Sequence, residues 1–122
     1  MSKNLKIIWL LGMVLIVAVG LIHVIDAKDS FSDAIYKGWL FYANGLASVI
    51  AAYGILKRQE WGWNFGLMIA IGSLGGYVAS RTVGLPLIAP EPDAWFEPIG
   101  VASMIAEAFY VLVFFLNRKN KL

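Results

Sequence analysis

The residue that most clearly points to chemistry is an acid inside a long apolar segment. Glu107 lies nine residues after Pro98, within the apolar run 99–116. A carboxylate in hydrocarbon costs a few kcal/mol on insertion scales, so such residues usually face a partner, a cavity or an ion pathway. At a helical rise of about 1.5 Å per residue, Asn44 and Ser73 reach a similar depth in two other apolar runs. These three side chains predict a shared polar layer.

Further polar residues extend this layer toward one end of the apolar runs. Tyr77 and Ser80 lie on the helical face of Ser73, and Ser103 lies one turn before Glu107. Other polar side chains surround the mouth of the layer, among them Asp26. The candidate binding or polar-network residues are His23, Asn44, Ser73, Tyr77, Arg81, Glu97, Ser103 and Glu107. We expect a crevice that is closed at its other end, where the runs are mostly Leu, Ile, Val, Phe and Ala.

Two interpretations of this layer remain open. A protonated Glu107 can donate a hydrogen bond to Asn44 or to a backbone carbonyl and thereby join two helices. Alternatively, Glu107 can bind a ligand or cation, or carry protons. His23 lies within a turn of the membrane surface, where it can simply be solvated. Arg81 can snorkel or pair with Glu97 instead of binding an anionic group.

Counts of residue types exclude several other chemistries. The chain has no cysteine, which excludes disulfides, thiolate zinc sites and cysteine nucleophiles. Its single histidine excludes a bis-histidine haem, and no GxSxG, HExxH or P-loop pattern occurs. His23 and Met104, with Asp26 or Glu97, have the right ligand types for copper but no spacing motif. We therefore expect no enzymatic activity and can assign no cofactor.

The composition indicates an integral membrane protein. The chain has 122 residues, of which 60% are hydrophobic and 15% charged, too apolar for a soluble domain of this size. Runs of about 18–21 residues are long enough to cross a bilayer. We expect the first run to be retained, because it is longer than the apolar core of a signal peptide. The predicted fold is an all-α bundle, a single domain over 1–122 with four spans at about 5–25, 36–56, 63–80 and 99–116.

The basic residues predict the orientation of these spans. Seven lie on one side of the predicted membrane, at Lys3, Lys6, Lys57, Arg58, Arg118, Lys119 and Lys121, and three on the other, at Lys28, Lys37 and Arg81. The positive-inside rule then places both termini in the cytoplasm and the mouth of the crevice outside. Because the basic residues lie at the ends of apolar runs, they do not indicate a nucleic-acid partner.

Local signals predict where the helices begin and how they pack. Ser30 and Asp33 resemble a capping box, which would start the second helix there. Pro98 suits the first turn of the fourth helix, and the proline-rich segment 82–97 is expected to be a loop. Small residues mark expected helix contacts, and the third run is richest in them, with Gly62, Gly66, Gly72, Gly75, Gly76 and Ala79.

The third and fourth runs carry a pattern that resembles a known family. Ser80-Arg81-Thr82-Val83-Gly84-Leu85-Pro86, followed by Trp95, Glu97-Pro98, Gly100, Ser103 and Glu107, is similar to a recurring pattern in an uncharacterised family of small four-helix prokaryotic membrane proteins. The likeness covers roughly residues 76–107. It implies that the outer mouth and Glu107 form one unit, and it implies no activity. In general form the chain also resembles accessory subunits of membrane enzyme complexes, such as those of archaeal copper-dependent ammonia monooxygenase.

Two functions follow as expectations for a multi-pass protein of the cell membrane. The first is a non-catalytic accessory or assembly subunit of a larger membrane complex, or a homo-oligomer, with other membrane subunits or itself as partner besides the lipid bilayer. The alternative is a binder or transporter of a small molecule or ion, through an outward-facing polar crevice around His23, Arg81, Glu97 and Glu107.

Overall fold

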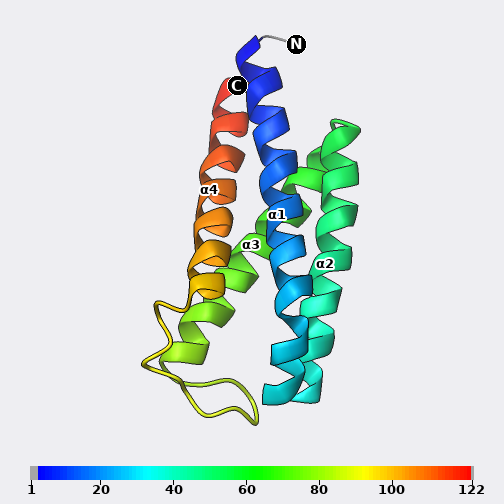
Figure 1. The fold of residues 1–122 in the computed structure, drawn as a ribbon. Helices are drawn as coiled ribbons and strands as arrows, with labels where there is room; N and C mark the ends of the chain where they lie inside the picture. Colours follow the sequence, from blue (N-terminus) through cyan, green and yellow to red (C-terminus); the bar gives the residue numbers. More distant parts are fainter. Residues whose placement is uncertain (1–2, 122) are drawn as a thin grey trace.

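The structure, a computed structural model, describes residues 3–121. These residues form four helices, α1 (Lys3–Asp33), α2 (Ile35–Leu56), α3 (Glu60–Arg81) and α4 (Pro98–Lys121), which confirms the all-α prediction for this part of the chain. Successive helices reverse direction, so the start of α1, the end of α4 and the turn 57–59 lie at one end of the bundle (Figure 1). We call this the termini end. The α1–α2 connection and the loop 82–97 lie at the opposite end, the loop end.

Three of the helices have the length and composition of membrane spans. These are α1, α2 and α4, which are long and apolar enough to cross a bilayer. α3 has the same length as α2, 22 residues, but it is not among the described helices that are also apolar enough. Its glycines and Asn64 lower its mean hydropathy. Three of the four predicted spans therefore correspond to helices that are both long and apolar enough to cross a bilayer. The span predicted at 63–80 corresponds to a helix that is long enough but less apolar.

α1 is much longer than its predicted span. It runs to Asp33, because the stretch after Ile25 contains no glycine or proline that would end a helix, and only Ala34 separates it from α2. The predicted capping box is wrong. Ser30 lies inside α1, and α2 begins after Ala34, which provides no side-chain cap. Asp33 instead accepts a hydrogen bond from Lys37, 2.7 Å away.

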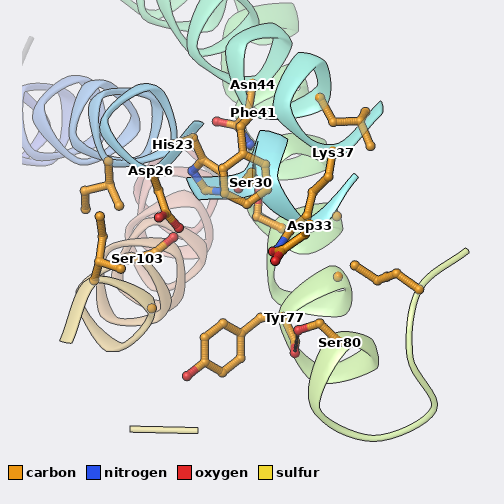
Figure 2. A pocket seen from close by; sticks show the side chains of 18 of the residues that line it. His23, Asp26, Ser30, Asp33, Lys37, Phe41, Asn44, Tyr77, Ser80 and Ser103 are labelled. Atoms are coloured by element: carbon orange, nitrogen blue, oxygen red, sulfur yellow. Dashed lines mark hydrogen bonds and ion pairs between the residues drawn. The ribbon is translucent and has the colours of Figure 1, made fainter. Parts of the chain in front are cut away.

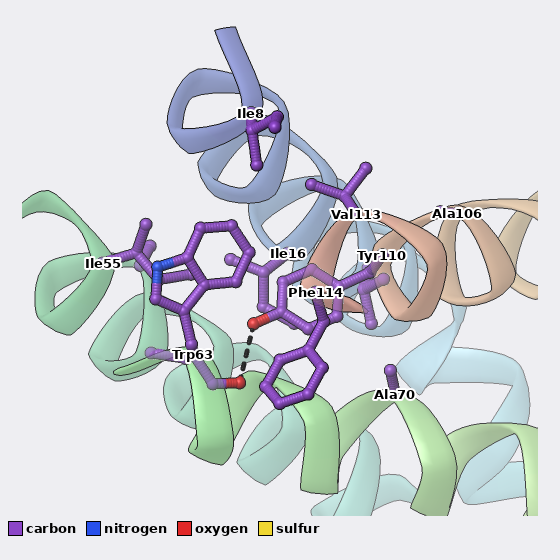
Figure 3. Packing of buried hydrophobic residues seen from close by; sticks show 12 residues of the cluster. Ile8, Ile16, Ile55, Trp63, Ala70, Ala106, Tyr110, Val113 and Phe114 are labelled. Atoms are coloured by element: carbon purple, nitrogen blue, oxygen red, sulfur yellow. Dashed lines mark hydrogen bonds between the residues drawn. The ribbon is translucent and has the colours of Figure 1, made fainter. Parts of the chain in front are cut away.

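The termini end of the bundle is closed by close backbone contact and aromatic packing. Gly62 of α3 lies directly against Gly54 of α2, where a Cβ on either residue would meet the backbone of the other below 3.0 Å. Trp63 stacks on Tyr110, whose hydroxyl donates a hydrogen bond of 2.9 Å to the Trp63 carbonyl, and Phe114 packs beside them (Figure 3). α2, α3 and α4 are therefore fixed together at this end.

Toward the loop end, α3 separates from α2. It runs obliquely behind α1, from the turn beside α2 to the lower end of α4 (Figure 1). α1 and α2 stay close, since Gly20 lies against Ser48 and Gly45. In contrast, a Cβ at Gly72, Gly75 or Gly76 would meet nothing within 4 Å. Only the first glycines of α3 are packing positions, and the later ones border open space. α4 starts at Pro98 and 82–97 contains no helix, as predicted.

Candidate functional site

A pocket of about 820 Å³ opens between the helices at the loop end. Its walls come from all four helices and the loop 82–97 (Figure 2). All eight residues selected from the sequence line it, namely His23, Asn44, Ser73, Tyr77, Arg81, Glu97, Ser103 and Glu107. The structure thus brings these eight residues together around one pocket.

A polar network connects the helices along the pocket wall. Ser48 donates a hydrogen bond of 3.3 Å to the Asn44 amide oxygen, and the Asn44 amide nitrogen donates one of 2.9 Å to Ser73. Ser73 lies close enough to the Glu107 carboxyl group to interact with it. Ser103 donates a hydrogen bond of 2.7 Å to Glu107 Oε2. Glu107 is 1% exposed, so its carboxyl group is held almost entirely by protein groups.

His23 lies deeper than the sequence predicted. Its Nε2 is 3.7 Å from Glu107 Oε2, and the residue is 8% exposed, so it does not lie at the mouth. The physical reason is the length of α1, because ten further helical residues follow His23 before the helix ends. Its Nδ1 lies 2.8 Å from the Val19 carbonyl oxygen, one turn earlier. A carbonyl oxygen only accepts, so Nδ1 carries a hydrogen and donates it.

Arg81 and its neighbours attach the loop to α3. The Arg81 guanidinium donates hydrogen bonds to the Ala94 carbonyl, at 3.2 Å, and to the Ser80 hydroxyl, at 2.7 Å, and lies 3.8 Å from the centre of the Tyr77 ring. The Tyr77 hydroxyl donates to the Trp95 carbonyl. Arg81 therefore holds the loop against α3 through these hydrogen bonds. Within residues 3–121 it forms no ion pair, so it does not pair with Glu97, which the sequence had left open.

The pocket is strongly acidic. Six of the chain's eight Asp and Glu residues line it, namely Asp26, Asp29, Asp33, Glu91, Glu97 and Glu107. Its lining includes two of the ten Lys and Arg residues, Lys37 and Arg81. Both bases have partners of their own. Lys37 donates a hydrogen bond to Asp33, and its ammonium nitrogen lies 5.4 Å from the centre of the Phe41 ring. The remaining mouth acids are therefore not neutralised by a neighbouring base within the described residues.

Sequence reasoning missed several lining residues. Ser30 is 1% exposed, and its hydroxyl is one of two buried side-chain polar groups in the described chain that lack a hydrogen-bond partner. Phe41 packs its ring against His23, with ring centres 4.8 Å apart. The helical spacing of His23, Asp26, Ser30 and Asp33 on α1 would have revealed this wall, had the helix been extended to Asp33 in the prediction.

Of the residues that have ligand types suited to copper, some line the pocket and one does not appear in its lining. His23 and Asp26 both line the pocket, but Met104 is not among the described residues that do. Between residues 3 and 121, no group of three or more His, Asp or Glu side chains is arranged to hold a metal ion.

No family model, curated protein or solved structure matches the chain. The pocket, with the charges and hydrogen-bonding groups that line it, is therefore the feature of the chain that points to a function.

Proposed function

We propose that the chain is a four-span protein of the cell membrane, with both termini in the cytoplasm, that binds a small molecule from outside in the loop-end pocket. The observation that carries this proposal is the pocket itself. Its volume of about 820 Å³ lies in the range of small-molecule sites. Its walls combine apolar side chains, such as Ile22 and Ile99, with a few convergent polar groups around Glu107. This combination is typical of binding sites and exceeds what a contact between helices requires.

The outer surface of the bundle supports membrane insertion. Large apolar side chains are exposed on the outside of each helix, among them Val14, Leu46, Ile71 and Phe115. On a soluble monomer such a surface would be exceptional, whereas lipid covers it without cost. The excess of Lys and Arg at the termini end supports a cytoplasmic position for that end.

Cysteine labelling tests this topology. The chain has no native cysteine, so a single introduced thiol reports its own position. We expect Asn120→Cys to react with a membrane-impermeant maleimide only after the cytoplasmic side is opened, and Ala89→Cys to react in intact cells. Reaction of both positions from the same side would contradict the four-span orientation.

Filling the pocket tests the binding function. Gly76 and Gly75 are neighbours on α3, and an added Cβ at either meets nothing within 4 Å, but of the two only Gly76 lines the pocket. Thermal-shift screening with metals, quinones, organic anions and organic amines should reveal compounds that stabilise the wild type. We expect Gly75→Leu to retain this stabilisation and Gly76→Leu to lose it. Equal stabilisation of both variants, or no stabilisation by any class, would contradict the proposal.

A second function, as an accessory or assembly subunit or a homo-oligomer, is favoured by a different surface. A shallow apolar groove runs along the outside of α3, lined by Ile71, Leu74, Gly75, Val78, Ala79, Thr82 and Val83. Close approach of another helix needs such a surface with a small residue at its centre. Purification in mild detergent tests this candidate, since a monodisperse monomer without a co-purifying partner would contradict it.

A further inference from the structure

We infer that the pocket binds an elongated organic amine, with an ammonium group that donates hydrogen bonds to both His23 Nε2 and Glu107 Oε2. The inference rests on the proposed function and specifies its ligand.

The deep end of the pocket has two acceptor atoms that face each other, His23 Nε2 and Glu107 Oε2, and Oε2 also accepts the hydrogen bond from Ser103. Because His23 Nδ1 donates to Val19, the Nε2 atom of a neutral His23 has a lone pair. Nε2 and Glu107 Oε2 are 3.7 Å apart, which is too far for a direct hydrogen bond. An ammonium group has three N–H donors and a positive charge, so it can bond both atoms at once.

Ser30 provides a second, independent indication of a ligand. Its hydroxyl is buried in the pocket wall and has no hydrogen-bond partner. Buried polar groups are nearly always paired, so an unpaired one in a cavity wall indicates a bound group. Ser30 and His23 lie on the same face of α1, seven residues or about 10 Å apart. A ligand that reaches both must be elongated.

The mouth favours a cation over an anion. Asp26, Asp29, Glu91 and Glu97 line it without ion-pair partners in the described chain, and the two lining bases already have partners. A cleft with one sign of charge concentrates ions of the opposite sign. Between the mouth and Glu107, apolar side chains such as Ile22 and Ile99 suit a hydrocarbon body.

Three linear probes of equal length test the charge of the ligand. They are 1,8-diaminooctane, 1,8-octanediol and octanedioate, whose end groups are cationic, neutral and anionic. Isothermal titration of the purified full chain in nanodiscs should give saturable binding of the diamine, at least about tenfold tighter than binding of the diol or the diacid. The extended diamine can reach from Glu107 toward Ser30.

Matched variants locate the binding. Glu107→Gln keeps the shape of the side chain but removes its charge, and it should weaken diamine binding about tenfold or more. Ser30→Ala should weaken it a few-fold, since one acceptor is lost. Asp93→Asn removes the same charge from an exposed acid that is not among the lining residues, so its affinity should equal that of the wild type.

Protons should compete with the amine for the same lone pairs. An alkyl ammonium titrates near about pH 10, so the diamine stays charged as the pH is lowered from about 8 to 5. Its affinity should fall over this range, because a proton on Nε2 or Oε2 occupies the ammonium position. The charged and titratable groups that also face the pocket are Asp26, Asp29 and Asp33 of α1, Tyr36 and Lys37 of α2, Tyr77 and Arg81 of α3, and Glu91 and Glu97 of the loop. The Glu107→Gln variant should lose the part of the pH dependence that comes from Oε2 and keep the part that comes from His23 Nε2.

The outcomes separate this inference from the proposed function. Tighter binding of the diol or the diacid, abolished by Gly76→Leu, would overturn the amine assignment and leave the binding pocket in place. Diamine binding that Glu107→Gln does not change would also overturn it. If none of the three probes binds in a manner sensitive to Gly76→Leu, the amine assignment fails, and the compound screen described above then decides whether the pocket binds any other class.

Discussion

Replacing Gly62 with alanine is expected to push α3 away from α2 and to destabilise the whole bundle. The added Cβ would lie 2.4 Å from the Gly54 carbonyl carbon and 2.5 Å from the Ile55 backbone nitrogen. Backbone atoms cannot move aside as a flexible side chain can, so the two helices must separate. Such overpacking costs about 1–3 kcal/mol and occasionally more.

Gly75→Ala is the matched control for this prediction. Both variants add one methyl group to α3 and gain about 1 kcal/mol of helix propensity, but at Gly75 the methyl group meets nothing within 4 Å. The melting temperature in detergent should therefore fall for Gly62→Ala and stay level or rise for Gly75→Ala. Equal melting temperatures would show that α2 and α3 are not in backbone contact.

Replacing Glu107 with leucine is expected to strand the polar groups that its carboxyl group holds. Ser103 would lose its acceptor and His23 its neighbour at 3.7 Å. A stranded buried polar group costs about 1–3 kcal/mol in soluble proteins, and interhelical bonds in membranes average about 0.6 kcal/mol. Glu107→Gln keeps an acceptor oxygen for Ser103, so its stability should remain close to that of the wild type.

The comparison of these two variants separates structure from binding. Glu107→Leu should lower both the melting temperature and the retention of ligand, whereas Glu107→Gln should lower ligand affinity alone. Identical melting temperatures for wild type, Gln and Leu would show that Glu107 does not take part in the polar network, and would remove the deep end of the proposed site.

The sequence was sufficient to predict the helices and much of the site. Apolar runs of bilayer length and the position of Pro98 gave four helices with short connections. Depth along each run placed Asn44, Ser73 and Glu107 at one level, and all three line the pocket. This works because the helical rise is constant, so distance from a helix end converts directly into depth.

Other features depend on how the helices cross, which the sequence pattern does not specify. A glycine looks the same whether it contacts a neighbouring backbone, as Gly62 does, or borders a cavity, as Gly76 does. The depth of His23 was mispredicted because α1 continues past the expected membrane boundary to Asp33. The attachment of the loop through Arg81 and Ala94 joins residues that no periodicity relates.

The most direct test of the pocket as a site open to the outside is the reactivity of a thiol placed inside it. Ser103 lines the pocket one turn before Glu107, and Ser103→Cys would be the only cysteine in the chain. In intact cells we expect it to react with a trimethylammonium-ethyl methanethiosulfonate faster than with the sulfonate-ethyl reagent, because the mouth is acidic. Gly76→Leu should slow both reactions. Failure of both reagents from outside, while Ala89→Cys reacts normally, would contradict an outward-open pocket.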